Sequence, residues 1–350
     1  MRLFKTWVLV LFLPILLSGC STVQYLWQAG RGQFAILNHA RPIPEVVKDE
    51  RTPPRIRALL AEVAAIKIFG EKAGLKPTKN YQEYVNLDRD AVVTVVSACQ
   101  PLKFQPKEWK FPIVGGFPYL GFYDPSDAVK YATELRSQGF DVDVRGAPAY
   151  STLGWFRDPI LSTMIPEGEG AIGELVEVIL HESLHATAYV NHQAFFNESA
   201  ASFVSEKLTP LYFRETRGID SKEEKAYAKG LEWQSRAMNR MHEGYVELDQ
   251  VYSSVDPDQE KLKKKADVFA KLRTDLKWRG SRDLNNATLI GHREYSGNRE
   301  VFSEMLKKCG QDFGAFLQGL SALKESDFSG AQTKELDGLL AVFPCGGRRS

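Results

Sequence analysis

Residues 171–202, AIGELVEVILHESLHATAYVNHQAFFNESAAS, are the most informative part of this chain because they contain His-Glu-Ser-Leu-His at 181–185. His181 and His185 are four residues apart, so a helix places both imidazoles on one face, one turn apart. Two imidazoles at this spacing can bind one zinc ion (Zn²⁺). Glu182 beside them can accept a proton from water that is activated there. The stretch therefore predicts a helical metal centre and a zinc hydrolase.

The surroundings of the pentapeptide favour a metal centre over a solvated helix face, which is the alternative. Apolar residues flank it on most sides of the predicted helix: Val176, Val178, Ile179, Leu180, Leu184 and Val190. Buried histidine and glutamate side chains cost free energy unless they are paired or bind a metal.

A hydrolytic zinc site needs three protein ligands and one open position, and two residues could supply the third ligand. His192 follows His185 by seven residues and lacks the glycine and spacing of HExxHxxGxxH, which argues against it. Glu198 fits better, because residues 191–193 can end the first helix and a second helix that opens near Phe196 would return Glu198 to the metal. The other role open to Glu198 is to stabilise a helix N-terminus with its carboxylate.

The first twenty residues resemble a bacterial lipoprotein signal. Arg2 and Lys5 precede an apolar stretch at 7–17, and LSGC at 17–20 matches the lipobox. The match implies cleavage before Cys20 and acylation of its thiol, which would anchor the mature chain to a membrane. We expect an outer-membrane lipoprotein that faces the periplasm. The inner membrane, an ordinary cleaved signal and an uncleaved anchor helix are the alternatives.

Three further cysteines stay in the mature chain, and an oxidising periplasm allows disulfides. Cys309 and Cys345 both lie in the C-terminal part and are the favoured pair, although the sequence does not determine connectivity. Cys99 ends a valine-rich run and is expected to be a buried free thiol.

Charge and composition limit the function classes. The 350 residues include 45 basic and 44 acidic side chains, a formal net charge of +1, so nothing indicates nucleic-acid binding. We expect a signal peptide at 1–19 and one zinc metallopeptidase domain at 20–350. Its parts are a helical region at 24–80, a small sheet with the active-site helices at 89–218, and a helical region at 221–345. No oligomeric state can be assigned from the sequence.

Hydrophobic periodicity predicts an α+β fold that is mostly helical, with a small β-sheet beside the HExxH helix. Residues 146–165 are expected to form a long loop that leads to this helix. Strands are expected at 91–97, within 109–123 and at 140–145. Helices are expected at 24–38, from Pro54 to about 70, at 126–138 with Ser126 as the N-cap, on both sides of 253–257, and within 284–324.

Four features together resemble the bacterial putative aminopeptidase family of gluzincin type: the lipobox, RGAPAYSTLGWFRDP at 145–159, HESLH, and FNESAA at 196–201. The resemblance extends from about residue 24 to about residue 325. It implies a zinc metallopeptidase fold that acts on peptides, with His181, His185 and Glu198 as ligands and Glu182 as the general base.

Peptide hydrolysis at such a site needs a second donor to the developing oxyanion. Tyr295 and Tyr150 are the candidates, and either could instead be a packing residue. Two other functions stay open. One is a lipid-anchored binding or scaffold protein with a structural or inactive zinc site, for which His192 is the nearby candidate for a fourth ligand. The other is a zinc hydrolase that acts on cell-wall cross-links.

Overall fold

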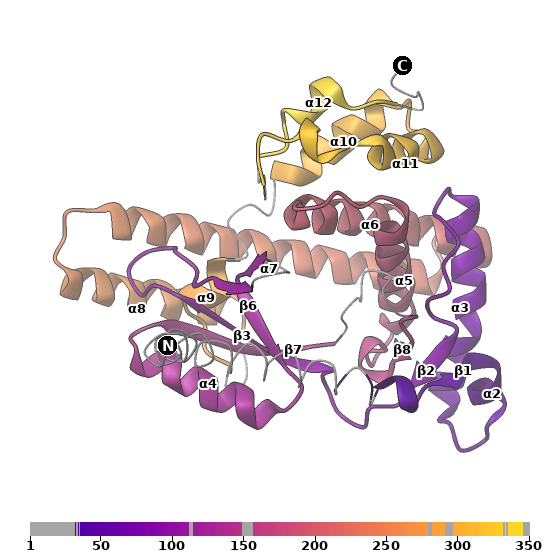
Figure 1. Cartoon of the computed structure of the whole chain (residues 1–350), viewed down its shortest axis with the longest axis horizontal. Helices are drawn as coiled ribbons and strands as arrows, with labels where there is room; N and C mark the ends of the chain where they lie inside the picture. The colour runs from indigo at the N-terminus through magenta and orange to yellow at the C-terminus, as the bar shows by residue number, and fades with distance from the viewer. Residues whose placement is uncertain are drawn as a thin grey trace, which may run out of the picture.

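The arrangement of elements comes from a computed structural model, which describes residues 32, 34, 36–111, 115–148, 157–278, 282–290, 297–331, 333 and 335–345. The fold is α+β and mostly helical, as the periodicity predicts (Figure 1). The helices are α2 (Ile43–Lys48), α3 (Pro54–Lys72), α4 (Pro125–Ser137), α5 (Ala171–Thr187), α6 (Ala194–Arg217), α7 (Lys222–Ser253), α8 (Asp258–Asp275), α9 (Asn286–Leu289), α10 (Gly297–Lys308), α11 (Phe313–Ala322) and α12 (Leu339–Val342).

The strands among the described residues form two three-stranded sheets and one two-stranded sheet. The first sheet has the order β1-β2-β8, the second has the order β6-β3-β7, and β4 pairs with β5. The strands are β1 (Arg41–Pro42), β2 (Glu83–Val85), β3 (Val93–Cys99), β4 (Trp109–Phe111), β5 (Gly115–Phe117), β6 (Tyr119–Phe122), β7 (Asp141–Ala147) and β8 (Ile160–Leu161). Two short 3-10 turns are η1 (Ser162–Met164) and η3 (Glu325–Asp327).

A small sheet shares the core of the HExxH helix, but its strands are not the valine-rich ones. β8 runs parallel to β2, with Ile160 opposite Tyr84, inside the segment that the sequence predicts to be a loop. Ile160 is fully buried in the same core as Leu175 and Ile179 of α5. A two-residue strand has no alternating pattern to detect, so periodicity could not reveal β8. The valine-rich β3 lies in the other sheet, which packs against α4.

The predicted N-cap of the helix after β6 was wrong by two residues. α4 begins at Pro125, and Asp124 is its N-cap. The Asp124 carboxylate accepts bonds from the Ser126 N–H at 2.8 Å and the Ser126 hydroxyl at 2.7 Å. Proline suits the first helical position because its fixed φ is helical and it has no N–H that needs a partner. α6 likewise starts at Ala194, two residues before the expected start.

The break between the two long amphipathic helices lies where the sequence predicts it. α7 and α8 are separated at 254–257 and pack against each other (Figure 1). They share a second hydrophobic core with α9, made of Met241, Leu248, Tyr252, Val268, Phe269, Leu272, Leu284 and Leu289. Within the described residues, no helix is both long and apolar enough to cross a membrane.

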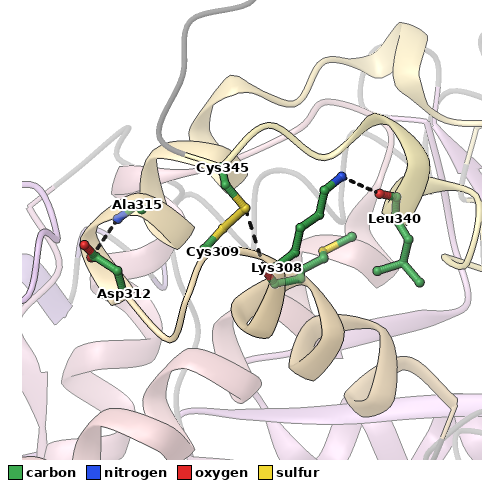
Figure 2. Close-up of a disulfide and its surroundings, with 7 residues drawn as sticks. Lys308, Cys309, Asp312, Ala315, Leu340 and Cys345 are labelled. Atoms are coloured by element: carbon green, nitrogen blue, oxygen red, sulfur yellow. Dashed lines mark hydrogen bonds between the residues drawn. A yellow bond between two sulfur atoms is a disulfide. The ribbon is translucent and has the colours of Figure 1, made fainter.

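A disulfide closes the C-terminal helices, which gather next to α6 (Figure 1). Figure 2 shows the bond between Cys309, just after α10, and Cys345, just after α12. The Lys308 ammonium also donates to the Leu340 carbonyl at 2.9 Å. Cys99 is a buried free thiol, as predicted, and burial raises its pKa to about 12. The favoured cysteine pairing is therefore the one that the structure has.

Removing this disulfide should destabilise the fold. The two cysteines are 36 residues apart. In the chain-entropy treatment, a closed loop of that length raises the free energy of the unfolded chain by about 4 kcal/mol. We expect the Cys309→Ser/Cys345→Ser double variant to lose up to about that much free energy of unfolding in urea titrations. A reductant should lower the stability of the wild type towards that of the variant and leave the variant unchanged. Equal stability of the oxidised and reduced wild type would contradict this expectation.

Candidate metal centre

The HESLH pentapeptide lies near the C-terminal end of α5, a helix whose buried residues are mostly apolar. The rings of His181 and His185 are adjacent, with centroids 5.0 Å apart and planes at 81°. The side chain of His181 is 20% exposed and that of His185 is 5% exposed. The core-facing residues of α5 are almost fully buried, including Leu175, Val176, Ile179, Leu180 and Leu184. The imidazoles therefore lie at the edge of the core, with His181 partly exposed to solvent.

A fixed turn between α5 and α6 brings Glu198 to the histidines. The side-chain oxygen of Asn197 accepts a bond from the Val190 N–H at 2.9 Å, and its amide group donates to the Val190 carbonyl at 2.8 Å. Asn197 is 2% exposed, so water does not compete for these bonds. Ala200 and Ala201 are buried where α6 packs against α5. This turn and the small side chains place the first turn of α6 beside the histidine face of α5.

The C-terminal helices support the same part of α6 from the other side. Phe196 packs against Phe302 of α10 and Phe328 after η3, with ring centroids 5.7 Å and 5.1 Å apart. Arg299 of α10 forms an ion pair with Glu206 of α6. The disulfide-closed helices thus fix the position of the helix that carries Glu198.

The Glu198 carboxylate faces both imidazoles. Its Oε2 lies 3.2 Å from Nε2 of His181, and its Oε1 lies 3.4 Å from Nε2 of His185. Four ligands around a tetrahedral zinc at about 2.0–2.2 Å are about 3.3–3.6 Å from one another. Two nitrogen donors and one carboxylate are also the ligand set of hydrolytic zinc sites. Each imidazole is thus within ligand–ligand distance of one oxygen of the Glu198 carboxylate, and the chemistry of the three side chains fits a zinc ion.

The charges of the centre favour an ionised Glu198. Partial desolvation opposes ionisation of Glu198, but the hydrogen bond with His181 and the charges of His185 and His181 lower its pKa overall. Burial also opposes protonation of His181, yet Glu198, Glu182 and Glu177 together raise its pKa. The pKa of His185 is lowered by burial, and the nearby His181 contributes to this effect.

Glu182 is half-buried beside the two histidines. One ligand atom from each of His181, Glu182 and His185 lies within 4.8 Å of the others, so this trio could also hold a metal ion. Two alternative ligand sets therefore share the histidines and differ only in the glutamate. The set with Glu198 leaves Glu182 available for proton transfer.

A second glutamate of α5 lies one turn before His181 and is held by α7. The Tyr227 hydroxyl donates to Oε2 of Glu177 at 2.8 Å. Burial raises the pKa of Glu177, although the hydrogen bond from Tyr227 and the charge of His181 act to lower it. Gly173 permits the contact between the helices, since a Cβ there would lie 2.7 Å from the Tyr227 ring.

His192, the other ligand candidate that the sequence named, does not join this centre. His192 has a left-handed φ of 58°, is exposed, and pairs through Nδ1 with Oε1 of Glu325 at 3.0 Å. His192 is therefore paired with a residue of η3, which agrees with the prediction that it is not a metal ligand. Tyr150 and Tyr295 lie outside the described residues.

Two tyrosines that the sequence did not suggest lie close to the centre. The ring of Tyr189 is 6.2 Å from that of His185, at 74°. Tyr81 has a left-handed φ of 62°, and its N–H donates to the Asp158 carbonyl at 2.8 Å. Burial and the charges of Glu182 and Asp158 raise the pKa of Tyr81 well above its usual value. Tyr189 lies two residues beyond the end of α5, so the helical spacing of residues 181 and 185 does not extend to it.

The fold and the site define a class: a mostly helical α+β protein whose HExxH helix presents side chains that can hold a metal ion. The particular family follows from a match of residues 24–335 to the family model described as putative aminopeptidase. The chain belongs to this family, which agrees with the resemblance seen in its motifs and supports a peptidase-type function. No curated protein and no solved structure matches the chain.

Proposed function

We propose that this protein is a zinc-dependent peptidase, in which His181, His185 and Glu198 hold the metal and Glu182 is the general base. The observation that carries the proposal is the convergence of Nε2 of both histidines on the Glu198 carboxylate, at 3.2 Å and 3.4 Å. An ion pair with a protonated histidine gives similar distances, so metal analysis of the purified protein is the first test. A protein that binds no zinc would refute the proposal.

Each side chain then has a defined task. Bound zinc supplies a Lewis acid that polarises the peptide carbonyl and lowers the pKa of water. Glu182 accepts a proton from the attacking water and delivers it to the leaving amine. Glu198 and the histidines would hold the metal, and the partly exposed side chains of His181 and Glu198 mark the side from which a peptide would approach. Tyr295 and Tyr150 stay the candidates for the donor to the oxyanion.

The family supports a peptide substrate, and we propose removal of N-terminal residues as the reaction. The metal-loaded protein should be incubated with a mixed peptide library, and the product termini should be read by mass spectrometry. Release of single N-terminal residues is expected. Internal cuts would overturn the aminopeptidase assignment, and bound zinc without any cut would favour a binding protein or a hydrolase of cell-wall cross-links. The pairing of His192 with Glu325 argues against a closed four-ligand structural zinc.

We also propose that the chain is a lipoprotein anchored through Cys20 and exposed to the periplasm. Cells that express the full chain can be fed an alkyne-tagged fatty acid, and the immunoprecipitated protein can be probed for the tag. The wild type should carry the label and the Cys20→Ala variant should not. Equal labelling of both proteins, or of neither, would exclude acylation at Cys20.

A further inference from the structure

One ring nitrogen of His185 has an unusual environment. Nε2 faces Glu198, whereas Nδ1 is buried and makes no hydrogen bond within the described part of the chain. Metal-binding histidines almost always donate their other ring N–H to a carboxylate, a carbonyl or water, and this bond sets the orientation of the ring. His185 is only 5% exposed. Apart from the contact of Nε2 with Glu198, its orientation therefore comes from packing against its neighbours.

Two aromatic rings supply this packing. The His181 ring lies edge-on to His185 at 5.0 Å, and the Tyr189 ring lies edge-on at 6.2 Å. Such perpendicular arrangements at these distances are favourable. Because His181 is itself a proposed ligand, Tyr189 is the neighbour of this kind that the proposed mechanism does not already use.

The backbone around Tyr189 is held firmly, although its side chain is 43% exposed. Ala188 and Val190 on either side of it are 7% and 4% exposed. The Ala188 N–H donates to the Leu184 carbonyl at 2.7 Å. The N–H and the carbonyl of Val190 both form hydrogen bonds with the Asn197 side chain. A half-exposed ring on a fixed backbone can restrain its neighbour without being part of the core.

We propose that Tyr189 is a positioning residue for the metal centre: its ring, in place of a hydrogen bond, holds the His185 imidazole with Nε2 directed at the metal. The inference rests on the proposed function, because it takes zinc as the occupant. In this proposal the aromatic ring of Tyr189 orients His185, and the hydroxyl group of Tyr189 makes no contribution.

The test is zinc affinity, measured by competition with a chromophoric chelator. Tyr189→Ala and Tyr189→Leu should bind zinc about 10- to 100-fold more weakly than the wild type, which is the usual effect of losing a group that orients a ligand. Tyr189→Phe should bind like the wild type. Trp233→Ala removes an exposed ring from α7 and is the matched control, with no change expected.

Two further measurements separate positioning from folding. The metal-free variants should unfold at the same temperature as the metal-free wild type, and the visible spectrum of the cobalt-loaded protein should change only in Tyr189→Ala and Tyr189→Leu. Wild-type affinity in Tyr189→Ala and Tyr189→Leu would refute the inference while leaving the metal centre intact. A loss in Tyr189→Phe equal to that in Tyr189→Ala would also refute it, because the hydroxyl would then be responsible. A wild type without zinc affinity would reject the proposed function and this inference together.

Discussion

The Glu182→Gln variant should keep its zinc and lose peptide hydrolysis by about 100- to 10,000-fold, the range that a general base contributes. Glutamine preserves the size of the side chain but cannot accept a proton from water. If Glu182 is not a ligand, the metal stays bound by His181, His185 and Glu198. The measurement is kcat/KM on the best peptide of the library, together with zinc content per chain.

Glu174→Gln is a suitable control because it makes the same chemical change in the first turn of the same helix. It should keep both zinc and activity. Normal turnover in zinc-loaded Glu182→Gln would show that Glu182 is not the base. Loss of zinc from the same variant would show instead that Glu182 is a ligand, which the 4.8 Å trio with His181 and His185 allows.

The part of the fold that the sequence predicts best is the part that depends on regular spacing. The helix around HESLH, the helix that starts at Pro54, and the break between α7 and α8 all appear where the pattern places them. In each, apolar residues recur at the helical period over many residues, and tertiary contacts reinforce the same period. The proximity of Glu198 to the histidines was also predictable, because a short break between two helices leaves few paths for the chain. The break is at 188–193 and so begins three residues before the expected 191–193.

The sequence could not reveal features that depend on only a few residues or on distant contacts. β1 and β8 have two residues each, too few for a pattern. The cap at Asp124 depends on which of two polar residues precedes the first helical turn, and propensity ranks aspartate and serine about equally. Tyr189 is beyond the last residue of α5, and only the turn held by Asn197 makes its ring contact His185. These contacts are set by tertiary packing, and hence no local rule selects them.

The Glu198→Ala variant should lose zinc affinity by more than about 100-fold, which is the upper limit for groups that merely orient a ligand. Glu198 contacts Nε2 of both histidines, so its removal takes away one of three donors and leaves two imidazoles alone. Because its side chain is 64% exposed, the metal-free fold should be little affected. Affinity is measured by chelator competition, and folding by thermal unfolding of the metal-free protein.

Glu325→Ala is the matched control, since Glu325 also pairs with a histidine, His192, and its side chain is 54% exposed. It should bind zinc like the wild type, because the partner of its carboxylate is His192 and, in the described residues, no contact joins that carboxylate to the three proposed ligands. Together with Glu182→Gln, the Glu198 variant decides which glutamate is the third ligand. Full affinity in Glu198→Ala combined with lost affinity in Glu182→Gln would assign the ligand role to Glu182, and the general base would then have to be sought elsewhere.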